Sequence, residues 1–354
     1  GYGYASIGSG QRVLPKSLFR IASISKPITA VAILQLVDQG KLSLDDKVFE
    51  ILDYEPHLES GTASDPRQAE ITIAHLLGHR GGWDRDKSFD AMFRSVDFAK
   101  ALGSKPPASP HTVIRVMLGK PLDFDPGHRY AYSNYGYCLL GRVIEQLTGQ
   151  SYEEYVKSHV LAPLGITSMQ IGATHLAGRA DGEVRYYDPN LGPSVFSDNL
   201  GDNVPHPYGA WYLEAMDSHG AWIASATDLV RFACAFDSAE DCPLLSPESV
   251  TAMFARPDGL AGHDEKGKPK RKYYGLGWSI QMDDQGHRTA GHGGSLPGTN
   301  TQLTRRSDGK NVVLLFNSRL TPHTNRIVSA ALPKISKAID QVQSWPTHDL
   351  FDVA

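Results

Sequence analysis

The sequence is poor in cysteine and lacks both long hydrophobic runs and a strong excess of charge. Three cysteines in 354 residues are too few for a disulfide-stapled fold. Cys234 and Cys242 are close enough in sequence to form a bridge, whereas Cys138 lies in an apolar helical run typical of a core. The formal net charge of -4 gives no indication of a nucleic-acid partner. No stretch of about 18 apolar residues occurs, so the sequence predicts no membrane span.

Three recognisable signals are also missing. The chain starts at "GYGYAS" without the basic-then-apolar pattern of a signal peptide, so a periplasmic or secreted location is permitted but not indicated. No G-x-S-x-G pattern is present, which argues against an α/β-hydrolase. His75 and His79 have the i, i+4 spacing of some zinc sites, but they lack an intervening glutamate and an obvious third ligand. We therefore expect no metal site there.

The sequence does contain an ordered change from helical to strand patterns along the chain. Residues 1–13 favour a β-hairpin, and residues 24–39 favour a buried helix that ends at Gly40. The middle of the chain is rich in helical signals, and the last third contains short strands between Gly, Asp-Gly and polar turns. This pattern predicts an α+β fold of mixed α/β layers, with an antiparallel sheet, helices at both chain ends and a helical insertion.

The individual elements can be placed from their periodicity and caps. We expect helical segments at 41–52, 72–79, 133–149, 151–165 and 323–342, the last kinked near Pro333, and strands within 273–282, 287–294, 299–307 and 311–318. Ser151 and Glu154 form a predicted capping box, and "SDGKN" predicts a hairpin turn.

The first candidate site residues lie at the start of the first long helix. Ser23 and Lys26 are three residues apart, so both side chains lie on one helix face. The helix dipole and burial would favour a neutral lysine, which can accept a proton from a nearby hydroxyl. The alternative is that Ser23 only caps the helix while Lys26 extends to solvent.

A second candidate segment is "FDPGHRYAYSNYGYCLLG", residues 124–141. The Tyr132 hydroxyl could shuttle protons if nearby cations lower its pKa. The Asn134 amide can donate to a substrate carbonyl and accept from an N–H group. The alternative is that both residues merely cap the helix that follows.

A third candidate segment is "TAGHGGSLPGTN", residues 289–300. Two adjacent glycines after His292 allow the backbone to lie close to a ligand. A strand-edge N–H there could join the Ser23 N–H in an oxyanion hole, with His292 as a positive or hydrogen-bonding group near a substrate carboxylate or the tyrosine. The alternative is a glycine-rich turn with an exposed histidine.

Together, S-x-x-K, Y-x-N and H-x-G in this order resemble the three-part signature of penicillin-recognising serine hydrolases, the serine β-lactamase and penicillin-binding-protein superfamily. Tyrosine in the second motif is similar to the branch of class C β-lactamases, D-alanyl-D-alanine carboxypeptidases, D-aminopeptidases and family VIII carboxylesterases. The segments 18–48, 71–83, 126–149 and 220–236 look like family segments in family order.

The resemblance implies a β-lactamase/transpeptidase-like fold and an acyl-enzyme mechanism without cofactor or metal. By this resemblance Ser23 is the acylated nucleophile and Lys26 is its base partner. Tyr132 shuttles protons, and Asn134 holds both the substrate amide and the lysine. The active site would lie between an α/β domain of residues 1–58 plus 206–354 and a mainly helical insertion of residues 59–205.

The sequence departs from the family pattern in two places, the third motif and the start of the chain. His292 stands where the family usually has lysine, Gly294 closes the motif, and the Ser295 N–H resembles the second oxyanion donor. Because a histidine is only partly charged near neutral pH, it would hold a carboxylate less firmly, which favours an esterase or peptidase over an efficient β-lactamase. The family's leading helix and first strand are also absent before "GYGYAS", and an uncovered sheet edge would favour pairing with another chain.

The expected substrate is a small-molecule ester, amide or β-lactam. An esterase or weak β-lactamase is the first expectation, and a D-amino-acid peptidase is the second. A penicillin-binding or scaffold protein that does not turn over is the alternative from another class. We expect no nucleic-acid partner, and the sequence gives no indication of the oligomeric state.

Overall fold

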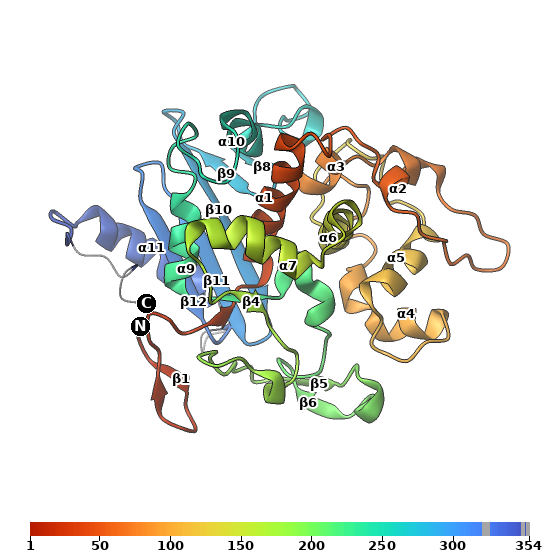
Figure 1. The fold of residues 1–354 in the computed structure, drawn as a ribbon, viewed down its shortest axis with the longest axis horizontal. Helices are drawn as coiled ribbons and strands as arrows, with labels where there is room; N and C mark the ends of the chain where they lie inside the picture. Colours follow the sequence, from red (N-terminus) through yellow and green to blue (C-terminus); the bar gives the residue numbers. More distant parts are fainter. Residues whose placement is uncertain (321–325, 348–350, 352–354) are drawn as a thin grey trace.

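The structure is a computed structural model that describes residues 1–320, 326–347 and 351. Its largest sheet has five antiparallel strands (Figure 1). The strand order is β12-β11-β10-β9-β8. The strands are β8 (Lys272–Tyr274), β9 (Ser279–Met282), β10 (Arg288–Leu296), β11 (Thr299–Arg305) and β12 (Asn311–Phe316). The predicted α+β class is therefore confirmed, and the predicted "SDGKN" turn joins β11 to β12.

Helix α1 (Ser25–Asp38) is buried almost completely. All of its residues are buried except the last two, which explains why its sequence is apolar on every side. Gly40, with φ 67°, follows the helix end as predicted. The helices α9 (Ala226–Cys234) and α11 (Ile327–Asp340) both pack on β11 and β12.

The predicted insertion, residues 59–205, is mainly helical. Its helices are α3 (Ile73–Leu77), α4 (Ser95–Ala101), α5 (Pro110–Leu118), α6 (Asn134–Thr148) and α7 (Tyr152–Val156). Its strands are β4 (Gln170–Ile171), β5 (Leu191–Pro193) and β6 (Asn203–Pro205). Because β4 pairs with β7 (Trp222–Ala224), which also pairs with β3 (Phe19–Arg20), the insertion shares a small sheet with the rest of the chain. The two-domain division itself stays a prediction.

The remaining helices and strands are short. They are β1 (Tyr4–Ser6), β2 (Gln11–Arg12), α2 (Val48–Ile51), α8 (Asp217–Gly220) and α10 (Pro247–Phe254). The predicted hairpin at 1–13 and the capping box at the start of α7 are confirmed. The predicted start of the last helix, residues 323–325, lies outside the described residues. Cys234 and Cys242 are free thiols, so the bridge that their spacing allowed does not form.

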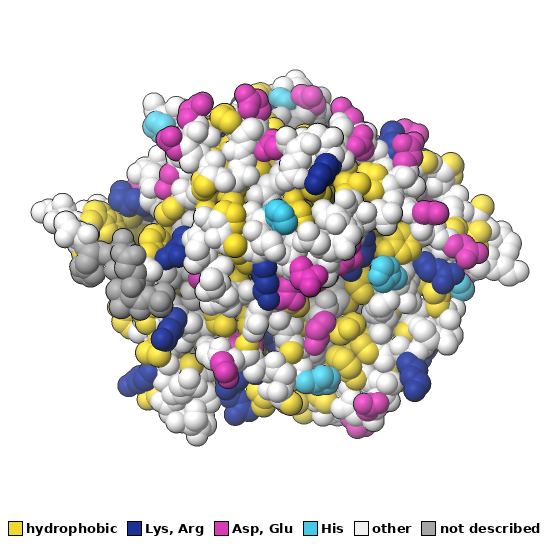
Figure 2. Space-filling model, in the orientation of Figure 1, with side chains coloured by type: hydrophobic (Ala, Val, Ile, Leu, Met, Phe, Trp, Pro, Cys, Tyr) yellow, Lys and Arg dark blue, Asp and Glu magenta, His cyan; other side chains and the backbone are white. Residues whose placement is uncertain are grey.

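Two surface features bear on possible partners. On the face shown in Figure 2, basic and acidic side chains are interspersed. Among the described residues, no helix combines the length and the apolar character that a membrane crossing requires.

The segment that leads to Ser23, residues 20–22, is held against the central sheet by threonines of β11. Thr299 Oγ1 donates to the Arg20 carbonyl at 3.0 Å, and Thr301 Oγ1 donates to the Ile21 carbonyl at 2.9 Å. Strand β10 lies just as close, because a Cβ built on Gly294 would overlap both Thr301 Oγ1 and the Ile21 carbonyl oxygen. Only glycine at position 294 allows this approach.

We predict that Gly294→Ala lowers the free energy of unfolding by about 1–3 kcal/mol, because the added methyl group must displace β10 or residues 20–22. The neighbouring variant Gly293→Ala is the matched control. Its new Cβ would lie no closer than 3.2 Å, to the flexible Gln302 side chain. Urea denaturation of the two variants measures the difference, and equal stabilities would contradict the close approach.

Candidate active site

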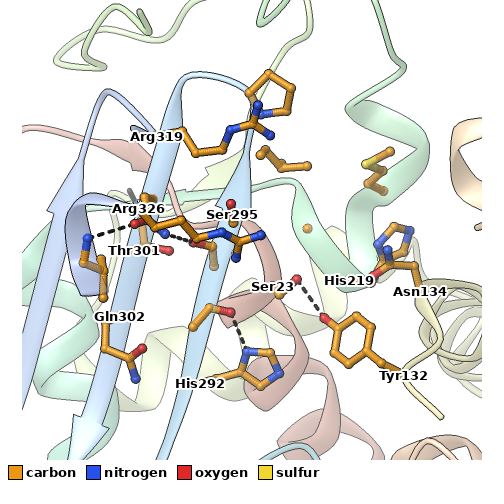
Figure 3. A pocket seen from close by; sticks show the side chains of 18 of the residues that line it. Ser23, Tyr132, Asn134, His219, His292, Ser295, Thr301, Gln302, Arg319 and Arg326 are labelled. Atoms are coloured by element: carbon orange, nitrogen blue, oxygen red, sulfur yellow. Dashed lines mark hydrogen bonds between the residues drawn. The ribbon is translucent and has the colours of Figure 1, made fainter. Parts of the chain in front are cut away.

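Six of the seven predicted site residues line one cavity of about 550 Å³ (Figure 3). They are Ser23, Tyr132, Asn134, His292, Gly294 and Ser295. The seventh, Lys26, is fully buried and hydrogen-bonds to two of them. Three segments that are far apart in the sequence are therefore brought together at the N-terminus of α1.

Ser23 lies in a tight turn rather than at the helix cap. It is the middle residue of a 3-10 helix, Ala22–Ile24, and the preceding Ala22 has a left-handed φ of 50°. Its Oγ lies 3.3 Å from Lys26 Nζ and 2.8 Å from the Tyr132 hydroxyl. In the described structure, the Ser23 side chain makes no helix-capping hydrogen bond, and Lys26 is buried instead of extending to solvent. The alternative in which Ser23 only caps the helix is therefore wrong.

Besides its contact with Ser23 Oγ, the buried amine of Lys26 lies within hydrogen-bond distance of two acceptor oxygens. Its Nζ lies 2.8 Å from Asn134 Oδ1 and 2.8 Å from the His219 carbonyl oxygen. Burial lowers the pKa of Lys26 well below 10.5, against an opposing effect of the Asp90 carboxylate. A neutral amine has two N–H bonds and one lone pair. With both hydrogens taken by the two carbonyl-type oxygens, the lone pair is left for Ser23 Oγ–H.

Tyr132 donates a hydrogen bond to Ser23 Oγ at 2.8 Å. Burial raises the pKa of the phenol above its usual value of 10, and this outweighs the lowering effects of the Ser23 hydrogen bond and of Arg85. The Arg85 guanidinium lies 4.7 Å from the centre of the tyrosine ring. The sequence analysis made proton shuttling conditional on nearby cations lowering this pKa. Arg85 does lower it, but burial raises it by more, so the phenol keeps its proton near neutral pH.

His79 fixes the segment that carries Tyr132. Its carbonyl accepts the Ala131 N–H at 2.9 Å, and its Nδ1 accepts the Ser133 N–H at 3.2 Å, so the two bonds flank Tyr132. The two rings lie 4.3 Å apart, and His79 adopts a left-handed φ of 55° to make these contacts. The sequence drew attention to His79 only as a metal ligand. Among the described residues, no group of three or more His, Cys, Asp or Glu side chains could hold a metal ion.

Burial favours the neutral form of His292. Its Nδ1 lies 2.8 Å from the Gly293 carbonyl oxygen and must carry the proton, so its Nε2 accepts from the Tyr274 hydroxyl at 2.9 Å. Burial lowers the pKa of His292 to about 3. The expectation that His292 is partly charged near neutral pH is therefore wrong. The cations that line the cavity are arginines, namely Arg85, Arg319 and Arg326.

Several residues of the site gave no clear signal in the sequence. His219 lines the cavity and accepts from Lys26 through its backbone carbonyl, which any residue type could supply. Asp90 accepts from Asn134 Nδ2 at 2.6 Å. Asn300 Nδ2 donates to the Gly294 carbonyl at 3.0 Å. His206, from the loop of residues 181–209, also lines the cavity.

We predict that the protein loses stability as the pH falls from about 6.5 toward 4. A histidine with a folded-state pKa of about 3 takes up its proton only in the unfolded state over this range. Each such group steepens the decline by up to about 1.4 kcal/mol per pH unit. Urea denaturation at several pH values should show a shallower decline for His292→Asn than for the wild type. The same substitution at exposed His128 is the control, and parallel declines for all three proteins would contradict the neutral His292.

Comparison with known proteins places this geometry in a family. The family model described as Beta-lactamase matches residues 1–333. The chain is 26% identical over 337 residues to penicillin-binding protein 4* of Bacillus subtilis, which covers 93% of this chain and 67% of that protein. It is 28% identical over 309 residues to a probable fimbrial assembly protein FimD of Dichelobacter nodosus, which covers 87% of this chain and 68% of that protein.

Two solved structures have a similar fold. The octameric penicillin-binding protein homologue from Pyrococcus abyssi has a TM-score of 0.70 at 24% identity, over 96% of this chain and 70% of that chain. The D-amino acid amidase from Ochrobactrum anthropi SV3 has a TM-score of 0.70 at 23% identity, over 97% of this chain and 89% of that chain. The predicted β-lactamase/transpeptidase-like fold is therefore confirmed.

Proposed function

Because the chain belongs to the β-lactamase family, we propose that it is a serine hydrolase that forms an acyl-enzyme on Ser23. One observation carries this proposal. Ser23 Oγ lies between a buried amine at 3.3 Å and a phenol at 2.8 Å, at the wall of a cavity large enough for a small substrate.

In the proposed acylation, Lys26 takes the proton of Ser23 Oγ as the oxygen attacks a carbonyl carbon. The N–H groups of Ser23 and Ser295 stabilise the negative charge on the carbonyl oxygen. Tyr132 gives its proton to the leaving group and recovers one from the Lys26 ammonium, so the net result is the transfer of one proton from Ser23 to the leaving group through Lys26 and Tyr132. Water then attacks the acyl-enzyme and releases the acid, which restores the Ser23 hydroxyl.

The charges around the cavity bear on the substrate. We propose small esters as the first substrate class, since neutral His292 supplies no positive charge for a carboxylate beside the nucleophile. A weak β-lactamase activity fits the same geometry. Amides or peptides of D-amino acids are the second class, supported by the fold shared with a D-amino acid amidase and by Arg319 and Arg326, which could meet an anionic group farther along the cavity. A protein that acylates without turnover is the remaining alternative.

We predict that Ser23→Ala abolishes turnover and labelling by a fluorophosphonate while the melting temperature stays nearly unchanged, because the Ser23 side chain caps no helix. Tyr132→Phe should lower turnover of the D-amino acid amide at least ten-fold, because its amine leaving group then lacks a proton donor. Activity is measured with p-nitrophenyl butyrate, a chromogenic cephalosporin and a D-amino acid amide, and mass spectrometry locates the adduct. Labelling on another residue would overturn the assignment of Ser23.

We predict that kcat/KM for the ester rises with pH through a midpoint well below 10.5, because Lys26 must be neutral to accept the proton and burial lowers its pKa. The raised pKa of Tyr132 means that the phenol keeps its proton across this range. A pH–rate profile measures the midpoint. A rate that rises only near the ordinary pKa of lysine would contradict Lys26 as a neutral base.

A further inference from the structure

Asp90 lies directly behind the asparagine of the site. It precedes a short 3-10 helix, Ala91–Phe93, and its Oδ2 accepts a hydrogen bond from Asn134 Nδ2 at 2.6 Å. Asn134 is 8% exposed, and the Asp90 side chain is 16% exposed, so water screens this pair only weakly. The Arg85 guanidinium lies 3.6 Å from the same carboxylate oxygen.

The Asp90 carboxylate decides which way the Asn134 amide points. An ionised carboxylate only accepts hydrogen bonds, so it must face the NH₂ group of the amide. The amide oxygen is thereby turned toward Lys26 Nζ, at 2.8 Å. If the amide were rotated by half a turn, its NH₂ group would face the amine and would take the lone pair that Ser23 needs.

We propose that Asp90 is a positioning residue for acylation, which holds Asn134 in the orientation that leaves the Lys26 lone pair free for Ser23. This inference rests on the proposed function. Asp90 does not itself line the cavity and has no hydrogen bond to Ser23, so it acts through Asn134.

The two oxygens of Asp90 have separate roles, and this makes the proposal testable. Oδ1 accepts the Met92 N–H at 3.2 Å and caps the short helix, whereas Oδ2 holds Asn134. Asp90→Asn keeps a good capping oxygen. Its NH₂ group would then face Asn134, which favours the rotated amide. The variant therefore removes the positioning role while it retains the cap.

Asp90→Asn also removes a negative charge near Lys26. Several titratable or charged groups surround the Lys26 amine. Asp90 and Arg85 lie on one loop, and His79 follows α3. The others are Tyr132 before α6, Tyr137 within α6, His219 in α8 and His292 in β10. Asp90 is the negative charge among them, and it raises the pKa of Lys26. Its loss should lower that pKa and move the acid limb of the pH–rate profile to lower pH.

The experiment compares fluorophosphonate labelling of Ser23 and kcat/KM for p-nitrophenyl butyrate in four proteins: wild type, Asp90→Asn, Asn134→Ala and the double variant. We expect Asp90→Asn to lose at least ten-fold in kcat/KM, with its acid limb at lower pH and a nearly unchanged melting temperature. In the Asn134→Ala background, the same substitution should cost less than three-fold, because the residue it acts through is gone. Asp86→Asn is the matched control. Asp86 is on the same loop beside the same arginine, but its side chain is 93% exposed, and wild-type rates are expected.

Two results would overturn the proposal: wild-type rates and pH profile in Asp90→Asn, or an equal loss with and without Asn134. If Asp90→Asn does not fold, Asp90→Ser replaces it, since serine also caps helices but is too short to hold Asn134. Labelling of Ser23 in the wild type tests the proposed function separately. A labelled wild type with an unaffected Asp90→Asn removes only the role of Asp90, whereas an unlabelled wild type removes the serine hydrolase itself.

Discussion

The whole site depends on the burial of one amine. Water would keep Lys26 charged, and a charged lysine has no lone pair with which to take a proton. The apolar surroundings of α1 lower its pKa, and two oxygens, from Asn134 and His219, accept its remaining hydrogens. The energetic cost of burying an amine is therefore coupled to the reactivity of the neighbouring hydroxyl.

The rest of the fold keeps this arrangement rigid. Helix α1 is enclosed on every side, so Lys26 cannot swing out to solvent. Hydrogen bonds from the β11 threonines hold the segment before Ser23 on the central sheet, and Gly294 lets β10 lie close to it. His79 accepts hydrogen bonds from the backbone N–H groups on both sides of Tyr132. Ala22, which precedes Ser23, and His79, whose ring contacts Tyr132, both have left-handed φ values. Strained backbone of this kind is common where a site must be held in one geometry.

The sequence could predict the fold class, many of the helices and strands, and six of the residues that line the cavity. Helical periodicity, caps and three ordered motifs are local signals, and each survives in a short stretch of chain. The sequence predicted the lowered pKa of Lys26 but could not predict the pKa shifts of Tyr132 and His292. Whether Tyr132 and His292 have raised or lowered pKa values depends on burial by distant segments, and motif spacing carries no such information. Asp90 was missed for the same reason, because its partner Asn134 lies 44 positions away.

The most direct test of this account is a nuclear magnetic resonance titration of the Lys26 side-chain amine in protein labelled with ¹⁵N and ¹³C at lysine. Lys26→Arg, which lacks the amine, assigns the signal. The account predicts a single titration with a midpoint well below 10.5, so that the amine is neutral where an ordinary lysine is charged. A midpoint at or above 10.5 would contradict it, since Ser23 would then lack a base.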